Sequence, residues 1–179
     1  MSEFVNITPQ ELTANPFRLI GSDWMLVTSA NNSKGLACGK DYNTMTASWG
    51  GVGILWNKPV AFVFIRPQRH TFGFTEENSR LTLSFFDENY RSALTFCGRN
   101  SGRDYDKASE CNLTPISDTN DSGRAVWFDE AKLVLTTKKL YADNIREDSF
   151  MANELLSNYK SGDFHRMYIC EIESVLLKK

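Results

Sequence analysis

An apolar run between two prolines, PVAFVFIRP at residues 59–67, is the feature that most restricts how this chain can fold. Its β-branched and aromatic side chains follow one another without alternation, which is typical of a strand buried on both faces. The residues just before it contain glycines and a turn sequence, WNKP. The run therefore predicts a central strand, at residues 60–66, in a sheet.

Shorter segments with strand and helix patterns surround this run. Alternating or apolar residues predict strands at 23–31, 42–50, 80–86 and 164–177, and further strands within 125–145 that turn near Asp129. Helix spacing and end signals predict short helices within 7–17, 71–78, 88–102 and 149–163. In the first of these, Thr8 is the expected cap, with Pro9 in the first turn and Glu11 three residues on. Together these segments predict a mainly β fold, a β-barrel with helical insertions.

Length and composition exclude several classes of protein. The 179 residues, 41% of them apolar, suit a single domain, residues 1–179, with a substantial core. A formal net charge of −2 offers no basic surplus for a nucleic-acid backbone. The N-terminus lacks the pattern of a signal peptide, and no apolar run approaches the length of a membrane span. We therefore expect a cytoplasmic protein that binds neither nucleic acid nor membrane.

The four cysteines do not form a recognisable metal or disulfide pattern. None belongs to a CxxC sequence, and none pairs with a histidine at metal-ligand spacing. We interpret Cys38, Cys97, Cys111 and Cys170 as reduced thiols, and we expect no metal site.

Hydroxyl and glycine residues gather in NTMTASWGG, residues 43–51, directly before the central strand. Taken alone, Thr44, Thr46 and Ser48 favour an ordinary solvated strand face. The alternative is a face that hydrogen-bonds a flat polar heterocycle, and the nearby glycines would let such a ligand approach the backbone.

A second polar segment, RPQRHT at residues 66–71, ends the central strand and begins a predicted helix. Helix N-termini attract phosphate through free N–H groups and the helix dipole, and arginine adds bidentate contacts. Surface ion pairing of Arg66 and Arg69 is the competing interpretation. A heterocycle platform and a phosphate clamp, without a P-loop or a GxGxxG sequence, suggest a mononucleotide cofactor bound outside a Rossmann fold.

Residues 43–78, NTMTASWGGVGILWNKPVAFVFIRPQRHTFGFTEEN, resemble the flavin reductase-like, FMN-binding split-barrel family, and within it the flavoredoxin-type branch. The segments NPFRLIGSDWMLVTSA, SGRDYDK and GDFHRMYICEIESV also resemble that branch, so the likeness covers most of the chain. In one departure, Cys170 stands where the family usually has glycine.

The resemblance implies roles for individual residues. Met45, Thr46, Ala47 and Ser48 are expected to line the flavin ring, with Asn43 and Trp49 beside them. Around the flavin phosphate the resemblance places Arg66, Arg69, His70 and Thr71, and it extends Lys107 toward the phosphate, although a solvated lysine remains an alternative. His165 is implied as a catalytic or site-adjacent residue, against the alternative of a structural histidine at the barrel rim.

The resemblance also implies the activity. We expect an FMN-binding oxidoreductase, an NAD(P)H-dependent flavin reductase that forms a homodimer. Two alternatives stay open: a flavoredoxin-like electron carrier reduced by a partner protein, and a flavin-binding module without turnover. The cofactor supplies the redox chemistry in such proteins, so no pair of catalytic carboxylates is required.

Overall fold

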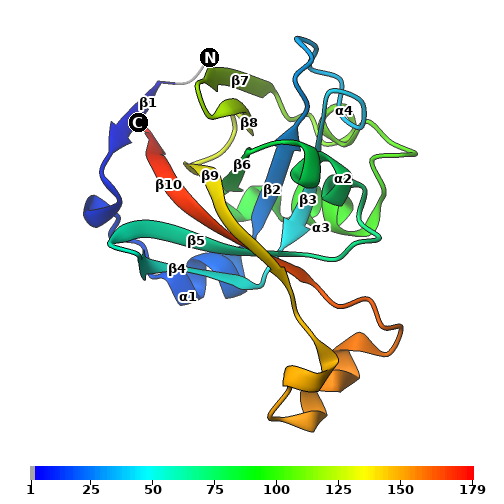
Figure 1. Cartoon of the computed structure of the whole chain (residues 1–179). Helices are drawn as coiled ribbons and strands as arrows, with labels where there is room; N and C mark the ends of the chain where they lie inside the picture. The colour runs from blue at the N-terminus through cyan, green and yellow to red at the C-terminus, as the bar shows by residue number, and fades with distance from the viewer. Residues whose placement is uncertain (1–2) are drawn as a thin grey trace.

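The computed structural model describes residues 3–179, and its largest element is one antiparallel sheet that curls on itself (Figure 1). Strand β1 pairs with β10, and the other strands follow the order β3-β2-β6-β9-β10-β5-β4. The strands of this sheet are β1 (Phe4–Ile7), β2 (Met25–Ala30), β3 (Tyr42–Ala47), β4 (Gly50–Leu55), β5 (Lys58–Ile65), β6 (Arg80–Phe85), β9 (Leu133–Asn144) and β10 (Arg166–Lys178). The fold is mainly β with helical insertions, as the sequence predicts.

The two ends of the strand order, β3 and β4, are consecutive in the chain. Only Ser48 and Trp49 lie between them, so the sheet is interrupted within the hydroxyl and glycine stretch. Gly50 begins β4 with a φ of 153°, and a Cβ there would lie 2.7 Å from the Phe62 carbonyl oxygen. The glycine lets β4 approach β5 directly after the interruption.

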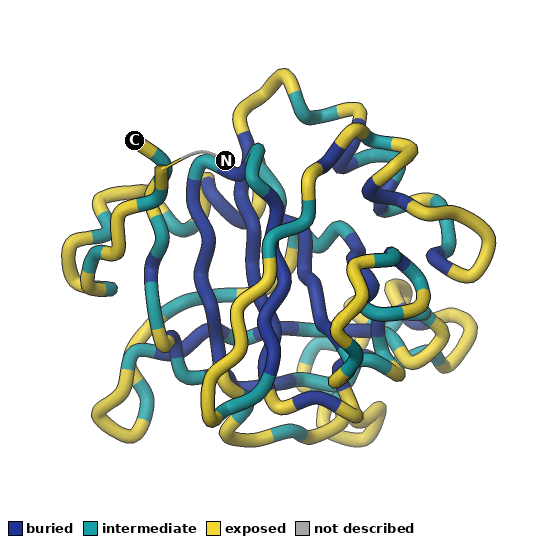
Figure 2. Tube along the Cα trace, turned by 90° about the horizontal axis from the view of Figure 1, so that it is seen from above, coloured by how far each residue is buried: buried dark blue, intermediate teal, exposed yellow. Residues whose placement is uncertain are grey.

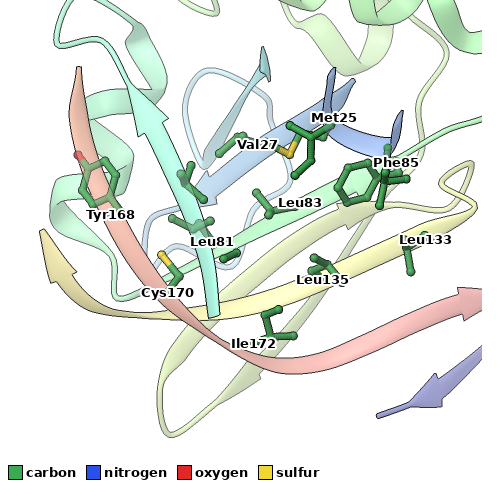
Figure 3. Packing of buried hydrophobic residues seen from close by; sticks show 14 of the residues in the cluster. Met25, Val27, Leu81, Leu83, Phe85, Leu133, Leu135, Tyr168, Cys170 and Ile172 are labelled. Atoms are coloured by element: carbon green, nitrogen blue, oxygen red, sulfur yellow. The ribbon is translucent and has the colours of Figure 1, made fainter. Parts of the chain in front are cut away.

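The curled sheet encloses the first of two apolar clusters. Its members come mainly from β2, β5, β6, β9 and β10, and they point toward one another in Figure 3; they include Met25, Val27, Leu81, Leu83, Phe85, Leu133, Leu135, Tyr168, Cys170 and Ile172. The central strands are buried along their length, whereas the surrounding loops are exposed (Figure 2). Burial of this apolar surface is the main force that holds the barrel together.

A second apolar cluster lies outside the barrel, under a two-stranded hairpin and the helices. The hairpin consists of β7 (Pro115–Asn120) and β8 (Gly123–Phe128). Helices α3 (Arg91–Arg99) and α4 (Lys107–Glu110) contribute Leu94, Cys97 and Ala108 to the cluster. The predicted helix at 71–78 is α2 (His70–Glu77), and Arg69 is its N-cap residue.

The first predicted helix, within 7–17, is instead two short turns. A 3₁₀ turn at Pro9–Glu11 follows Thr8, whose N–H donates to the Glu11 carboxylate at 2.7 Å, as expected of a capping box. The Thr8 hydroxyl also donates to this carboxylate, at 2.7 Å. A separate turn, α1 (Pro16–Arg18), begins after Asn15, whose side chain accepts the Phe17 N–H. The second proline starts a new helical turn, because proline suits a first turn and not a helix interior.

The predicted amphipathic helix within 149–163 is wrong. Residues 145–165 form an excursion beyond the β9–β10 pair, with 3₁₀ turns at Glu147–Ser149 and Asn153–Tyr159 (Figure 1). Met151 is 99% exposed, so the excursion lacks the buried apolar stripe that stabilises most helices. Ser157 and Asn158 also donate to nearby backbone carbonyls, which competes with α-helix formation.

Three strands, β1, β4 and β7, were not predicted from the sequence, because they are short, glycine-rich or polar. The central strand also differs from its prediction: Phe62 and Phe64 of β5 are half-buried, so one face of this strand is partly open. Within the part of the chain described, no helix has both the length and the apolar character needed to cross a membrane.

Candidate functional site

A hollow of about 230 Å³ lies at the interruption of the sheet. It contains eight of the twelve residues that the sequence singles out, together with Phe64 of β5, which the sequence analysis missed. Its lining residues are Met45, Thr46, Ala47, Ser48, Trp49, Phe64, Arg66, Arg69 and His165. Phe64 is one of the half-buried residues of the central strand, and strict alternation from the buried Val63 and Ile65 would have identified it.

One wall of the hollow is the end of edge strand β3 and the link that follows it. An edge strand presents backbone N–H and C=O groups that no neighbouring strand uses. The Thr46 hydroxyl donates to the Leu94 carbonyl of α3, which leaves its oxygen able to accept a hydrogen bond. With the Ser48 hydroxyl, this wall offers both donors and acceptors to a flat polar ligand.

Another part of the lining is Arg69, at the N-terminus of α2. Its guanidinium donates to two carbonyls at the end of α3, those of Gly98 at 2.9 Å and Cys97 at 3.4 Å. Burial, with a contribution from the nearby Arg66, lowers the pKa of Arg69. Among the described residues no carboxylate pairs with this guanidinium, and no side chain caps the helix. The corner therefore combines an unneutralised cation with helix N–H groups, which suits an anion.

Arg66 also lines the hollow, but its charge is already paired. It forms an ion pair with Asp163 of the excursion and donates to the Asn158 carbonyl at 2.9 Å. Gln68 donates to the same Asp163 carboxylate at 2.6 Å. Arg66 thus fixes the excursion against β5 and brings less positive charge to the hollow than Arg69 does.

His165 lies in an aromatic part of the hollow and is 8% exposed. Its ring is 5.4 Å from the Trp49 ring and 6.4 Å from the Phe64 ring, and its Nδ1 lies 3.0 Å from the Tyr159 hydroxyl. Burial, reinforced by the positive charge of Arg66, lowers the pKa of His165 to about 4. The imidazole is therefore neutral at pH 7 and offers a hydrogen bond without a charge.

Four of the singled-out residues lie outside the lining of the hollow. Asn43 and Thr71 are buried and bonded to each other, Nδ2 to Oγ1 at 2.7 Å. His70 Nε2 is 3.0 Å from the Gly39 carbonyl oxygen. Lys107 is buried, and its Nζ bonds to backbone carbonyls. These four residues hold β3, α2, α3 and the adjoining loops together behind the hollow.

The cysteines lie away from the lining of the hollow. All four are free thiols, and the sulfurs of Cys97 and Cys111 are 4.0 Å apart. Cys170 is fully buried, and burial raises its pKa to about 12, so it behaves as a small apolar residue. Within residues 3–179, no three His, Cys, Asp or Glu side chains are grouped to hold a metal ion.

A family model described as "flavin reductase like domain" matches residues 17–179. The chain belongs to the flavin reductase-like family. The match includes every residue of the hollow, so the site lies within the flavin reductase-like part of the chain. A comparison with curated proteins gave no match.

Solved structures share the fold of this flavin reductase-like chain. An FMN-binding domain of a flavin reductase-like enzyme from Shewanella baltica has 16% identity and a TM-score of 0.64, over 99% of this chain and 78% of that one. The flavoredoxin of Desulfovibrio vulgaris has 19% identity and a TM-score of 0.64, over 98% and 78%. Component B of nitrilotriacetate monooxygenase from Bacillus cereus has 18% identity and a TM-score of 0.63, over 100% and 84%. These likenesses establish the fold, a split barrel.

Proposed function

We propose that this chain binds FMN in the hollow and acts as an NAD(P)H-dependent flavin oxidoreductase. One observation carries the proposal: the open end of β3 and the unneutralised Arg69 at the N-terminus of α2 border the same hollow. The first suits a polar ring system and the second suits a phosphate, and FMN has one of each.

The chemistry of the lining residues fits this cofactor. The Thr46 hydroxyl is held by the Leu94 carbonyl, so its orientation is set before a ligand arrives. Arg69 is likewise held by two carbonyls, so little conformational freedom is lost when an anion binds beside it. Pre-organised donors of this kind are what a bound phosphate and the edge of a flavin ring require.

Bound FMN would supply the electron-transfer chemistry, and the protein supplies orientation and electrostatics. Thr46 and Ser48 bind the polar edge of the ring, and Arg69 with the helix N–H groups binds the phosphate. His165 is neutral at pH 7, so it orients a ligand by hydrogen bonding or ring contact and does not supply a proton. Trp49, half-exposed at the mouth of the hollow, limits the access of water.

The reductant separates this proposal from its closest alternative, an electron carrier reduced by a partner protein. The structural similarity to a flavoredoxin is the observation that supports this alternative. The test is the absorption spectrum of the protein with FMN, recorded without oxygen before and after each nicotinamide is added. Rapid bleaching by NADH or NADPH supports the reductase. If FMN stays oxidised with both nicotinamides and is bleached only by a reduced protein partner, the chain is an electron carrier and not a reductase. If the chain does not bind FMN, both functions are rejected.

We also propose a homodimer, and a cytoplasmic location remains a prediction. The dimer is supported by large exposed apolar side chains around a second hollow, which shares Ser48 and Trp49 with the first. Phe17 of α1 lines this second hollow and is 87% exposed, and Ile54 of the neighbouring β4 is also exposed. Exposed apolar patches of this kind mark interaction surfaces.

A further inference from the structure

Lys107 is a buried lysine without an acidic partner among the described residues. It is 2% exposed and begins α4, behind the hollow. Its Nζ donates to the Thr44 carbonyl at 2.8 Å and the Cys97 carbonyl at 2.9 Å. Burial of a lysine charge is costly, and such residues are rare unless paired. Lys107 is thus a buried ammonium whose hydrogen-bond partners are two neutral carbonyls, which suggests a specific role for its charge.

The two carbonyls belong to β3 and α3, the strand that borders the hollow and the helix whose end holds Arg69. Thr44 lies on edge strand β3, two residues before Thr46, and is fully buried, so its carbonyl needs donors from within the protein, and Asn43 Nδ2 also donates to it at 3.4 Å. The Cys97 carbonyl at the end of α3 also accepts a hydrogen bond from Arg69. Lys107 therefore connects β3, the strand that borders the hollow, to the end of α3, which holds Arg69 of the phosphate clamp.

The surroundings of Lys107 leave its charge unneutralised. Its titratable neighbours are the guanidinium of Arg69 and the thiols of Cys38, Cys97 and Cys111. Burial raises the pKa of each of these thiols above its ordinary value, so they are neutral at pH 7. Two cations, Lys107 and Arg69, thus share the C-terminal carbonyls of α3, where the helix dipole favours positive charge.

We propose that Lys107 is a positioning residue for the phosphate end of the flavin: without touching the ligand, it fixes the Cys97 carbonyl, the more distant of the two carbonyls that accept from Arg69, and adds a buried positive charge behind the clamp. This inference rests on the proposed function. It differs from direct contact with the phosphate, because the Lys107 ammonium is buried and lies outside the lining of the hollow.

The test measures FMN and riboflavin affinity by calorimetry for the wild type and Lys107→Met. Riboflavin has the flavin ring and no phosphate. We expect FMN binding to weaken about tenfold or more, and riboflavin binding to change less than about threefold. In a double variant with Arg69→Ala, the two FMN losses should not add, because both act through one phosphate.

Lys139→Met is the matched control. Lys139 is half-buried, less buried than Lys107, and like Lys107 it donates to helix carbonyls, those of Thr75 and Glu76 at the far end of α2. Its loss should leave the ratio of FMN to riboflavin affinity unchanged. Folded Lys107→Met protein that binds FMN as the wild type does, or that loses both ligands in parallel, overturns the inference. A wild type that binds neither flavin overturns the proposed function as well.

A pH series on the wild type covers the case in which Lys107→Met does not fold. Burial lowers the pKa of Lys107 to about 8, and a neutral amine keeps N–H donors for both carbonyls. The ratio of FMN to riboflavin affinity should therefore fall between pH 7 and 9.5 while the fold is retained. A flat ratio contradicts the inference. The titratable groups that face Lys107 are Arg69, Cys38, Cys97 and Cys111, and their titration must be considered beside that of Lys107.

Discussion

Arg69 is the residue whose replacement most directly tests the phosphate clamp. In Arg69→Ala a charge-assisted hydrogen bond to the phosphate is lost, which is worth roughly 1.5–3 kcal/mol. FMN affinity should therefore fall about tenfold to a hundredfold, and riboflavin affinity should hardly change. Calorimetric titration of both ligands measures this.

Arg103→Ala is the matched control for the clamp. Arg103 is exposed in a neighbouring loop and donates to the Gln68 carbonyl at 3.4 Å. Its removal should leave both affinities unchanged. If Arg69→Ala lowers the affinities for FMN and riboflavin equally, or lowers neither affinity, Arg69 is not a phosphate ligand.

His165 should make stability depend on pH in the acidic range. Its pKa is lowered from 6.5 to about 4 in the folded protein, so the unfolded state binds the proton more readily. The stabilisation is complete above pH 6.5 and is lost as the pH falls from 6.5 to 4, by at most about 3 kcal/mol. Urea unfolding at several pH values measures it.

The other histidine in the chain provides the control. His165→Phe should flatten the dependence between pH 6.5 and 4, whereas His70→Asn should keep it. Several carboxyl groups with lowered pKa, among them Asp41 and Asp163, affect stability below this range. An unchanged slope in His165→Phe would show that His165 is not the titrating group.

At the scale of elements, the excursion at 145–165 is joined to β5 through Asp163. Arg66 and Gln68 both donate to this carboxylate. Asp163→Asn should loosen the excursion while the barrel stays intact, because the barrel core does not involve it. Hydrogen exchange should become faster within 147–163 and stay unchanged in α3.

The matched variant is Asp148→Asn, which removes an exposed ion pair with Arg146 inside the excursion. An exposed pair contributes about 1 kcal/mol or less, so exchange should hardly change. Equal exchange in both variants and the wild type would mean that the Asp163 contacts do not hold the excursion.

For the whole molecule, the main prediction concerns assembly. Light scattering at low micromolar concentration should give the mass of a homodimer. Phe17→Asp should shift the mass toward the monomer, because a charge placed in an apolar interface is costly. Met151→Asp, at the 99% exposed tip of the excursion, is the control and should remain dimeric. A wild-type monomer that still binds FMN would contradict the dimer.

Local patterns in the sequence were sufficient for much of the fold. The strands at 23–31, 42–50 and 80–86 follow from alternating or apolar side chains, and α2 follows from the helix pattern at 71–78. Side-chain periodicity is set by backbone geometry within a few residues, so a short stretch carries it. The excursion was predicted wrongly, because its helix pattern needed a buried partner surface that the fold does not provide.

The sequence by itself determined that residues 43–49 and 66–71 carry polar groups suited to a ring and a phosphate, and that most of the chain is β. The tertiary structure decided which of these groups border the hollow: it placed Arg69 there without a carboxylate, paired Arg66 with Asp163, and buried Asn43, Thr71 and Lys107 behind the walls. These outcomes depend on residues far apart in the chain. Asp163 is 97 positions from Arg66, and Lys107 is 63 positions from Thr44. Only packing of the complete sheet brings such groups together, and no local pattern records the pairing.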